Sequence, residues 1–164
     1  MALKFLINRL NKELTSLVLN PPEYIKVRCT NNIMIWVIEL KGAKNTVYEG
    51  ETFYLRFTFG ENYPFDPPEV VFIENIPENP HVYRQVLVGA FYNNNILCSN
   101  GHVCVSILYS QWTPAQTVES ICISLLSMLS SCIKKEWPKD NSNYVKQAFI
   151  SPQNVVWSFH DDSV

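Results

Sequence analysis

The sequence lacks a long hydrophobic run and carries little net charge. The longest apolar stretch, Ile121 to Leu129, is interrupted by Ser124 and Ser127 and is shorter than the roughly 20 residues that a membrane helix requires. The formal net charge is only −2, so electrostatics give no reason to expect a nucleic acid or a membrane as a partner. The N-terminus has no uninterrupted apolar core before Asn8 and Arg9, and we expect no secretory signal.

Paired cysteines are also missing. The five cysteines form no Cys-x-x-Cys pair and their number is odd, so a reducing compartment with free thiols is the simpler interpretation. What the sequence does contain is apolar material, since 47% of its 164 residues are hydrophobic and 17% are charged. This is enough for one compact domain, and we expect a single domain over residues 1–164.

The first two thirds of the chain show one helical pattern followed by strand-like patterns. Leucines at three- or four-residue steps indicate an amphipathic helix over residues 3–18. Three runs rich in β-branched and aromatic residues predict strands, and they cover residues 33–40, 52–59 and 69–73. An irregular stretch from Glu74 to the turn at Trp112 follows, and such a long segment inside a compact domain is usually functional or disordered.

The last third predicts helices. Thr117 is the expected N-cap of a helix that runs to about Cys132, and apolar residues on nearly all its sides predict that it is buried. Asp140 and Asn141 are candidate caps for a final helix over about 142–149. One helix, a three- to four-stranded antiparallel meander sheet and then C-terminal helices together predict an α+β domain.

Two motifs carry the functional information. The stretch from Gly101 to Leu108 places a single cysteine, Cys104, at the end of a short apolar run, and Gln-Trp-Thr-Pro-Ala follows at 111–115. About 40 residues upstream lies the corner Tyr-Pro-Phe-Asp-Pro-Pro at 63–68. Together these motifs resemble the ubiquitin-conjugating enzymes, whose cysteine carries ubiquitin as a thioester, and the resemblance extends through nearly the whole chain.

Three further matches resemble one branch of that family, the W-type enzymes that attach ubiquitin to protein N-termini. They are Asn100-Gly101-His102 before the cysteine, Ser106 after it, and the ending His160-Asp161-Asp162. The resemblance implies the ubiquitin-conjugating (UBC) fold, with Cys104 as the residue that accepts ubiquitin. An isolated cysteine is more often a buried strand residue, and the family context is what favours catalysis here.

The tripeptide Asn79-Pro80-His81 departs from the family pattern. Most ubiquitin-conjugating enzymes carry His-Pro-Asn eight residues before the cysteine, and the asparagine serves the oxyanion or its loop; the W-type branch has histidine at the third position. His81 therefore matches the branch, and its ring nitrogens can donate a hydrogen bond to an oxyanion. The alternative is that His81 only braces the loop.

A second departure from the family pattern concerns the residue that would deprotonate the acceptor amine. Many lysine-directed members of the family have aspartate two residues after the cysteine, where this sequence has Ser106. Only about 0.04% of a lysine is free base at pH 7, whereas roughly 10% of an α-amine is, so an enzyme directed at N-termini needs less help from a base. Asp140 aligns with an acidic gate residue of the family and is the remaining base candidate; its alternative role is to cap the next helix.

The spacing between His81 and Cys104 is longer than in the family. They lie 23 positions apart, against eight in the family, and removing residues 84–98 would restore the usual spacing. These residues look like an insertion beside the active site. They could cover the cleft, form an added hairpin or reflect an unspliced segment of the gene, and the sequence does not choose between these alternatives.

By resemblance, the first helix and two loops form the surface that binds ubiquitin ligases of the RING or U-box type. Phe65 is the expected aromatic anchor, because prolines on both sides hold it at a surface corner, and Pro114 and Ala115 are the second contact. For Trp112 we expect ordinary core packing.

The resemblance also implies the remaining partners. Lys4, Arg9 and Lys12 are expected to bind the activating enzyme, although they could equally be a solvated helix face. The other partners are ubiquitin and protein substrates, without a nucleic acid or a membrane. The chain itself needs no cofactor, because ATP is used by the activating enzyme, and the expected location is the cytoplasm and nucleus.

Two other hypotheses compete with an active enzyme. One is a zinc site made of ligand types that lie close together in the sequence, namely His81, Cys98, His102 and Cys104. No second closely spaced pair completes the usual zinc pattern, and we expect no metal site. The other is a UBC-like binding module whose chemistry is impaired by Asn79 and the insertion, although retention of Cys104 argues against it.

Overall fold

The computed structural model describes residues 2–84, 101–147, 151–155 and 157. It begins with helix α1 (Ala2–Leu19), continues through an antiparallel sheet and ends with helices α2 (Val118–Ser131) and α3 (Asn141–Gln147). Short 3₁₀ turns occupy Ser106–Leu108 and Pro152–Asn154. No helix in these ranges is both long and apolar enough to cross a membrane.

The sheet has six strands in the order β1-β2-β3-β4-β6-β5. Four long strands form the meander: β1 (Ile25–Asn32), β2 (Ile35–Lys41), β3 (Thr52–Thr58) and β4 (Glu69–Glu74). Two short strands, β5 (Val82–Tyr83) and β6 (His102–Val103), extend the sheet beyond β4. The α+β class is as predicted, but the sheet is larger than the predicted three or four strands.

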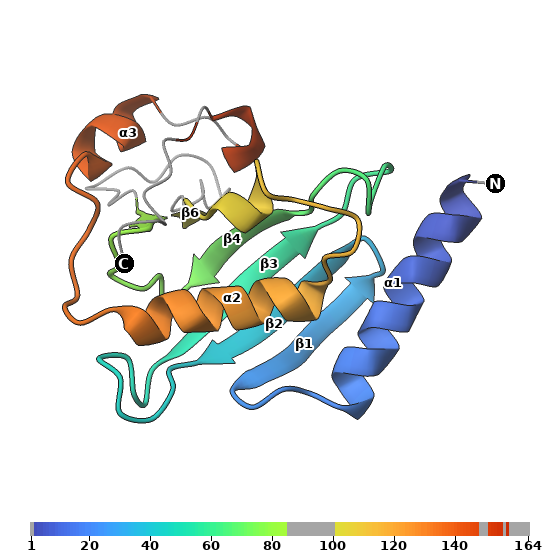
Figure 1. Ribbon diagram of the computed structural model, residues 1–164, viewed down its shortest axis with the longest axis horizontal. Coiled ribbons are helices and arrows are strands. Elements are labelled where there is room, and N and C mark those ends of the chain that lie inside the picture. The colour runs from blue at the N-terminus through green and yellow to red at the C-terminus, as the bar shows by residue number, and fades with distance from the viewer. Residues whose placement is uncertain (1, 85–100, 148–150, 156, 158–164) are drawn as a thin grey trace.

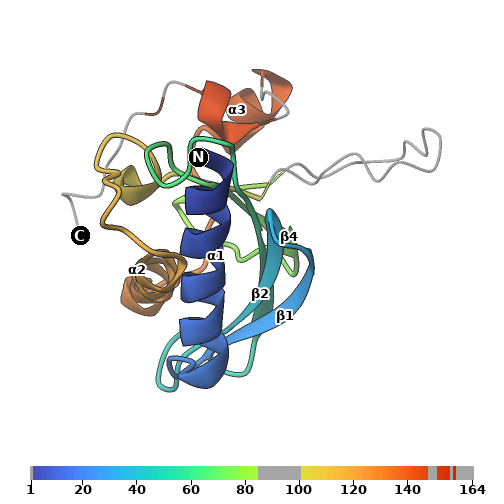
Figure 2. The ribbon, with the colours of Figure 1, turned by 90° about the vertical axis from the view of Figure 1, so that its right-hand side faces the viewer.

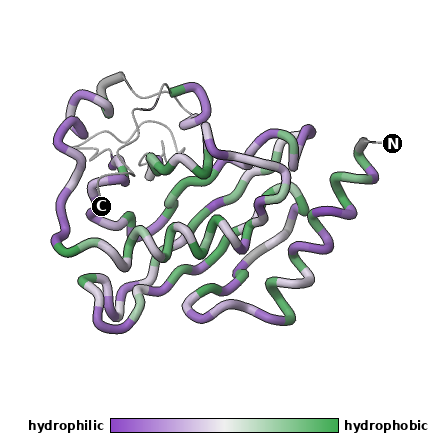
Figure 3. Tube along the Cα trace, in the orientation of Figure 1, coloured by the Kyte–Doolittle hydropathy of each residue, from purple (hydrophilic) through white to green (hydrophobic). Residues whose placement is uncertain are grey.

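Helix α2 lies across one face of the sheet, and α1 runs along its β1 edge (Figure 1). Viewed from the side, α1 stands between α2 on its left and strands β1 and β2 on its right (Figure 2). Hydrophobic residues gather along the strands and α2, whereas the loop between β2 and β3 is hydrophilic (Figure 3). In β3 the buried residues alternate strictly, with Phe53, Leu55 and Phe57 facing the core, as a sheet covered on one face requires.

Two helical predictions are confirmed and one is corrected. Thr117 caps α2 through a reciprocal pair of hydrogen bonds with Ser120, which satisfies backbone donors of the first turn. Helix α3 begins at Asn141, as the cap candidates predicted. However, α2 is buried on one face rather than all round, because Ile123 is 48% exposed and serines occupy the same outer side.

Strand β1 was not predicted, because its sequence Ile-Lys-Val-Arg-Cys-Thr-Asn-Asn mixes apolar residues with charges and turn formers. It lies at the edge of the sheet, where such residues are tolerated. Residues 33–34, predicted as the start of a strand, instead form the turn into β2. Strands β5 and β6 have two residues each and are too short to leave a periodic pattern.

Candidate active site

Cys104 lies directly after β6, and backbone pairing brings it next to His81. The Cys104 N–H donates to the His81 carbonyl oxygen at 2.9 Å, in register with the pair Val82 and Val103. The two residues are 23 positions apart in the sequence, and they meet because β5 and β6 are neighbours. Cys104 is buried, with 6% of its surface exposed.

The other described thiols are placed differently. Cys122 belongs to the core-facing side of α2 and is fully buried. Burial raises the pKa of its thiol far above the ordinary value. Cys132 is half-buried and donates to the carbonyl oxygen of Lys134 at 3.1 Å. A buried, protonated thiol is a poor nucleophile, which argues against Cys122. Cys104 is buried as well, so it is the candidate because of its place beside His81 and not because of its exposure.

Gly101 sets the path of the chain into β6. Its φ is +41°, and a Cβ built there would lie 2.0 Å from the carbonyl oxygen of Phe72. The close approach is used, because the Phe72 N–H donates to the Gly101 carbonyl oxygen at 2.9 Å. Gly101 therefore lets β6 lie against β4 and fixes the start of the segment that carries Cys104.

Replacing Gly101 with alanine is expected to destabilise the fold by about 3 kcal/mol, from overpacking and left-handed backbone strain together. Urea denaturation would measure the change. Gly60→Ala is the matched control, since a Cβ there meets nothing within 4 Å. Equal stabilities of the two variants would contradict this account of Gly101.

Asn79, the departure from the family tripeptide, is a buried structural residue. Its side-chain oxygen accepts from the His81 N–H at 2.9 Å, and its amide nitrogen donates to the Tyr48 hydroxyl at 3.3 Å. That hydroxyl in turn donates to the Glu78 carbonyl oxygen at 2.6 Å. Asn79 thus braces the loop that carries His81, which is the role suggested as an alternative for His81 itself.

The His81 side chain lines a hollow of about 480 Å³ next to the Cys104 segment. Ser106 lines the same hollow from the 3₁₀ turn that follows the cysteine. Its remaining wall comes from the 105–116 turn and the outer side of α2, namely Val105, Ile107, Gln111, Gln116, Ser124, Ser127, Met128 and Ser131. The sequence-predicted residues His81 and Ser106 therefore share one cavity, on the side of α2 that faces away from the core.

An aromatic cluster next to this site was not predicted. Tyr83 lies over Tyr144 with ring centroids 4.1 Å apart, and Trp157 packs against Tyr83, Tyr109 and Tyr144. The Tyr109 hydroxyl donates to the Val103 carbonyl oxygen at 3.0 Å, directly before Cys104. These aromatics are far apart in the sequence and have no common period, so only the fold reveals that they gather.

Two contacts join this cluster to polar residues. The Tyr144 hydroxyl and His102 Nδ1 are 2.8 Å apart, and the Tyr83 hydroxyl donates to the Asp140 carboxylate at 3.0 Å. Burial raises the pKa of Tyr83 and Tyr144, so both hydroxyls stay protonated at neutral pH. They therefore act as hydrogen-bond donors or dipoles rather than as bases.

Asp140 is exposed at the start of α3. Its backbone carbonyl oxygen accepts from the N–H groups of Asn143 and Tyr144, both at 2.9 Å, so it occupies the capping position of the helix. Its carboxylate faces Tyr83 of β5, the strand that pairs with the one before Cys104. Asp140 thus caps the helix with its backbone and also places a carboxylate near the segment that carries Cys104.

The expected ligase surface gathers α1 and two loops. Phe65 is 69% exposed and stacks on Phe5 of α1, with ring centroids 6.3 Å apart. Pro114 and Ala115 are exposed as well. Trp112 is half-buried against the core, and its indole N–H donates to the Pro64 carbonyl oxygen at 2.9 Å, which joins the two loops.

Replacing Phe65 with alanine is expected to weaken ligase binding about tenfold, because truncating an interface anchor typically costs over 1 kcal/mol. The melting temperature should hardly change, since the side chain is mostly exposed. Titration of a RING-type ligase domain and a thermal melt would check both parts. A large drop in melting temperature would instead make Phe65 a core residue.

The three basic residues of α1 do not share one environment. Lys4 and Lys12 are exposed, but the Arg9 guanidinium pairs with Glu13 and donates to the Gln116 carbonyl oxygen at 2.6 Å. Arg9 is thus held by its own chain. The contact with an activating enzyme stays a prediction, and of the three residues Lys4 and Lys12 are the exposed ones.

The predicted insertion at 84–98 lies, apart from Arg84, outside the described residues. Cys98 of the zinc hypothesis falls there too. Within the ranges that the structure describes, no group of three or more histidine, cysteine, aspartate or glutamate residues could hold a metal ion.

Comparison with known proteins gives consistent matches. The protein family described as "Ubiquitin-conjugating enzyme" matches residues 9–149. A probable ubiquitin-conjugating enzyme E2 W of Dictyostelium discoideum is 46% identical over 157 residues, which are 95% of this chain and 95% of the relative. The ubiquitin-conjugating enzyme E2 W of Caenorhabditis elegans is 46% identical over 160 residues, again 95% of each chain.

Solved structures agree with these relatives. The crystal structure of a ubiquitin-conjugating enzyme E2 from Agrocybe aegerita is 36% identical in sequence and superposes with a TM-score of 0.77. The match covers 89% of this chain and 96% of that one. A ubiquitin-conjugating enzyme E2 from Plasmodium falciparum is 32% identical with a TM-score of 0.65, over 77% of this chain and 85% of that one.

Proposed function

The chain belongs to the ubiquitin-conjugating enzyme family, and we propose that it accepts ubiquitin as a thioester on Cys104 and transfers it to the N-terminal α-amine of proteins. The observation that carries this proposal is the backbone pairing of Cys104 with His81, beside a hollow that His81 and Ser106 line. That pairing holds the backbone of Cys104 against the backbone of His81, a residue whose ring can donate a hydrogen bond.

The transfer is a nucleophilic acyl substitution. The acceptor nitrogen attacks the thioester carbonyl carbon, a tetrahedral oxyanion forms, and the C–S bond then breaks to give an amide and a Cys104 thiolate. The nitrogen loses one proton in the process and the thiolate can take one up. Preorganised donors at the oxyanion lower the barrier, and the His81 ring is the donor that we propose for this role.

The acceptor specificity rests on the absence of an acid at position 106. A serine hydroxyl cannot remove the proton of a lysine ammonium group, whose free base is roughly 250-fold rarer at pH 7 than that of an α-amine. We propose Asp140, which the Tyr83 hydroxyl holds, as the remaining carboxylate near the site. Its exposed position suits a gate for acceptors better than a strong base.

Ubiquitin-conjugating enzymes work with ubiquitin, an activating enzyme and ligases. For this chain we propose that Lys4 and Lys12 bind the activating enzyme, which uses ATP, while Phe65, Pro114 and Ala115 bind RING- or U-box-type ligases. Lys4 and Lys12 are exposed on α1, and Phe65 is exposed on the ligase side. Both surfaces include parts of α1, so the two partners would compete for it.

A charging assay tests the proposed function. The chain, activating enzyme, ATP and ubiquitin are mixed and run on a non-reducing gel, where a ubiquitin adduct that thiol releases is expected. Absence of any adduct under conditions that charge a known ubiquitin-conjugating enzyme would instead support a UBC-like binding module.

Introducing an acid at position 106 is expected to widen the acceptor range. Ser106→Asp should raise the rate of discharge onto free lysine about tenfold, below the roughly 10²–10⁴-fold of a well-positioned general base, because Ser106 is buried and an aspartate there is poorly solvated. The discharge rate of the charged enzyme in excess lysine is the measurement. Ser106→Asn is the matched control, because asparagine has the shape of aspartate without its charge. An equal gain in discharge rate for Ser106→Asn would contradict the argument that a base is missing.

A further inference from the structure

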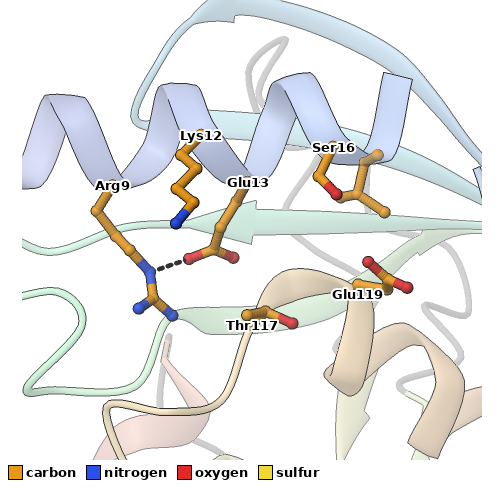
Figure 4. A pocket seen from close by; sticks show the side chains of 7 residues that line it. Arg9, Lys12, Glu13, Ser16, Thr117 and Glu119 are labelled. Carbon is orange, nitrogen blue, oxygen red and sulfur yellow. Dashed lines mark hydrogen bonds and ion pairs between the residues drawn. The ribbon is translucent and has the colours of Figure 1, made fainter. Parts of the chain in front are cut away.

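A single buried carboxylate joins α1 to the start of α2. Glu13 is only 7% exposed, and both of its oxygens accept hydrogen bonds. Oε1 accepts from the Tyr63 hydroxyl at 2.7 Å and from Nε of Arg9, while Oε2 accepts from the Val118 N–H at 2.8 Å. Figure 4 shows Arg9 and Glu13 pointing from α1 toward Thr117.

Arg9 extends the connection to the loop before α2. Its Nη2 donates to the Gln116 carbonyl oxygen at 2.6 Å, and its guanidinium carbon lies 5.9 Å from the centroid of the Tyr63 ring. The pair therefore connects α1, to which both residues belong, with two segments that are distant in the sequence: the corner at Tyr63 and the turn at Gln116. A buried carboxylate keeps its charge at low cost only when such partners surround it.

Each contact lies next to the expected ligase surface. Tyr63 precedes Pro64, whose carbonyl oxygen accepts from the Trp112 indole at 2.9 Å, and Phe65 follows directly. Gln116 follows Pro114 and Ala115. The Arg9–Glu13 pair thus anchors both loops one or two residues away from the side chains that would meet a ligase.

We propose that Glu13 and Arg9 are positioning residues for ligase-dependent transfer, because their ion pair fixes the two ligase-binding loops relative to α1. Arg9 then acts inside the molecule and not as a surface contact for the activating enzyme, in contrast to the expectation from the sequence. The inference deepens the proposed function and rests on its assignment of the ligase surface.

Charge-preserving and shape-preserving variants separate these roles. Glu13→Gln keeps the shape but removes the charge of the acceptor, and Arg9→Lys keeps a positive charge but cannot hold Glu13 and Gln116 together. Each should weaken binding of a RING-type ligase domain about tenfold, as the loss of an anchor does, and slow ligase-stimulated discharge. Because the two residues act as one unit, the double variant should be little worse than either single one.

The matched control is Glu119→Gln. Arg9, Glu13 and Glu119 line one hollow of about 230 Å³ between α1 and α2, and the Glu119→Gln variant should leave ligase binding unchanged. If Arg9 instead contacts the activating enzyme, Arg9→Ala would slow charging while Glu13→Gln would not, and additive losses in the double variant would also overturn the proposal.

A readout that needs no ligase keeps the inference separate from the proposed function. In ¹H–¹⁵N spectra, Glu13→Gln should shift the amide signals of Phe65 and Ala115, and Glu119→Gln should not. Unchanged signals at both positions would refute the positioning role, whatever the ligase result. Shifted signals without any ligase binding by the unmutated chain would refute the ligase assignment alone. Tyr63→Phe, which removes one hydroxyl, gives the same test should Glu13→Gln not fold.

Discussion

Replacing Cys104 with alanine is expected to abolish ubiquitin charging completely, because Cys104 is the described thiol that lies in the family motif and pairs with His81. Cys122 is fully buried and its pKa is raised, and Cys132 donates to a backbone carbonyl at the end of α2. Cys104→Ser should retain charging but as an oxyester, which thiol does not release. A non-reducing gel, with and without added thiol, distinguishes the absence of an adduct, a stable oxyester and the thiol-labile thioester of the unmutated chain.

The matched controls are Cys132→Ser and Cys122→Ala. Cys132→Ser should charge like the unmutated chain. Cys122→Ala removes a sulfur from the core, so it should lower the free energy of unfolding. The folded variant should still be charged with ubiquitin. Thiol-labile charging of the Cys104→Ala variant at a normal rate would contradict the assignment of Cys104.

Acetylating the N-terminus of an acceptor peptide is expected to reduce transfer by about two orders of magnitude, even when the peptide contains lysines. The reason is the roughly 250-fold lower free-base fraction of a lysine at pH 7, together with serine where many lysine-directed members of the family carry aspartate. Discharge of the purified thioester onto paired free and acetylated peptides is the measurement. Similar rates for the two peptides would mean that lysines are ordinary acceptors of this enzyme.

The fold was predictable where the residues of a single helix or strand carry a local sequence signal. The leucine spacing of α1, the strict alternation in β3 and the capping residue of α2 are local signals, and the structure confirms each of them. The resemblance to the W-type ubiquitin-conjugating enzymes is confirmed as well, by relatives that are 46% identical over nearly the whole chain.

The parts that were missed depend on contacts between distant segments. Strands β5 and β6 exist because Val82 pairs with Val103, and two-residue strands carry no periodicity of their own. Asn79 looked like a defect in the motif, yet its amide braces His81 from inside the fold. Arg9 looked like a surface charge, and only the position of Glu13 and Gln116 turns it inward.

The site residues stay a prediction from the sequence, and their surroundings could not be predicted from it. His81 and Ser106 line one hollow, and the Cys104 backbone N–H donates to the His81 carbonyl oxygen. The neighbouring aromatic side chains of Tyr83, Tyr109 and Tyr144 were not foreseen, because they come from a strand, a turn and a helix that are far apart in the sequence.

The most direct test of the account is to map the bond made in a single turnover. The thioester-charged enzyme is purified and mixed with a peptide that has one free N-terminus and one internal lysine, and the product is fragmented in a mass spectrometer. We expect the C-terminal glycine of ubiquitin on the peptide's α-nitrogen, with free Cys104 left on the enzyme. Ubiquitin on the lysine side chain, or a thioester mapped to Cys122 or Cys132, would contradict the account.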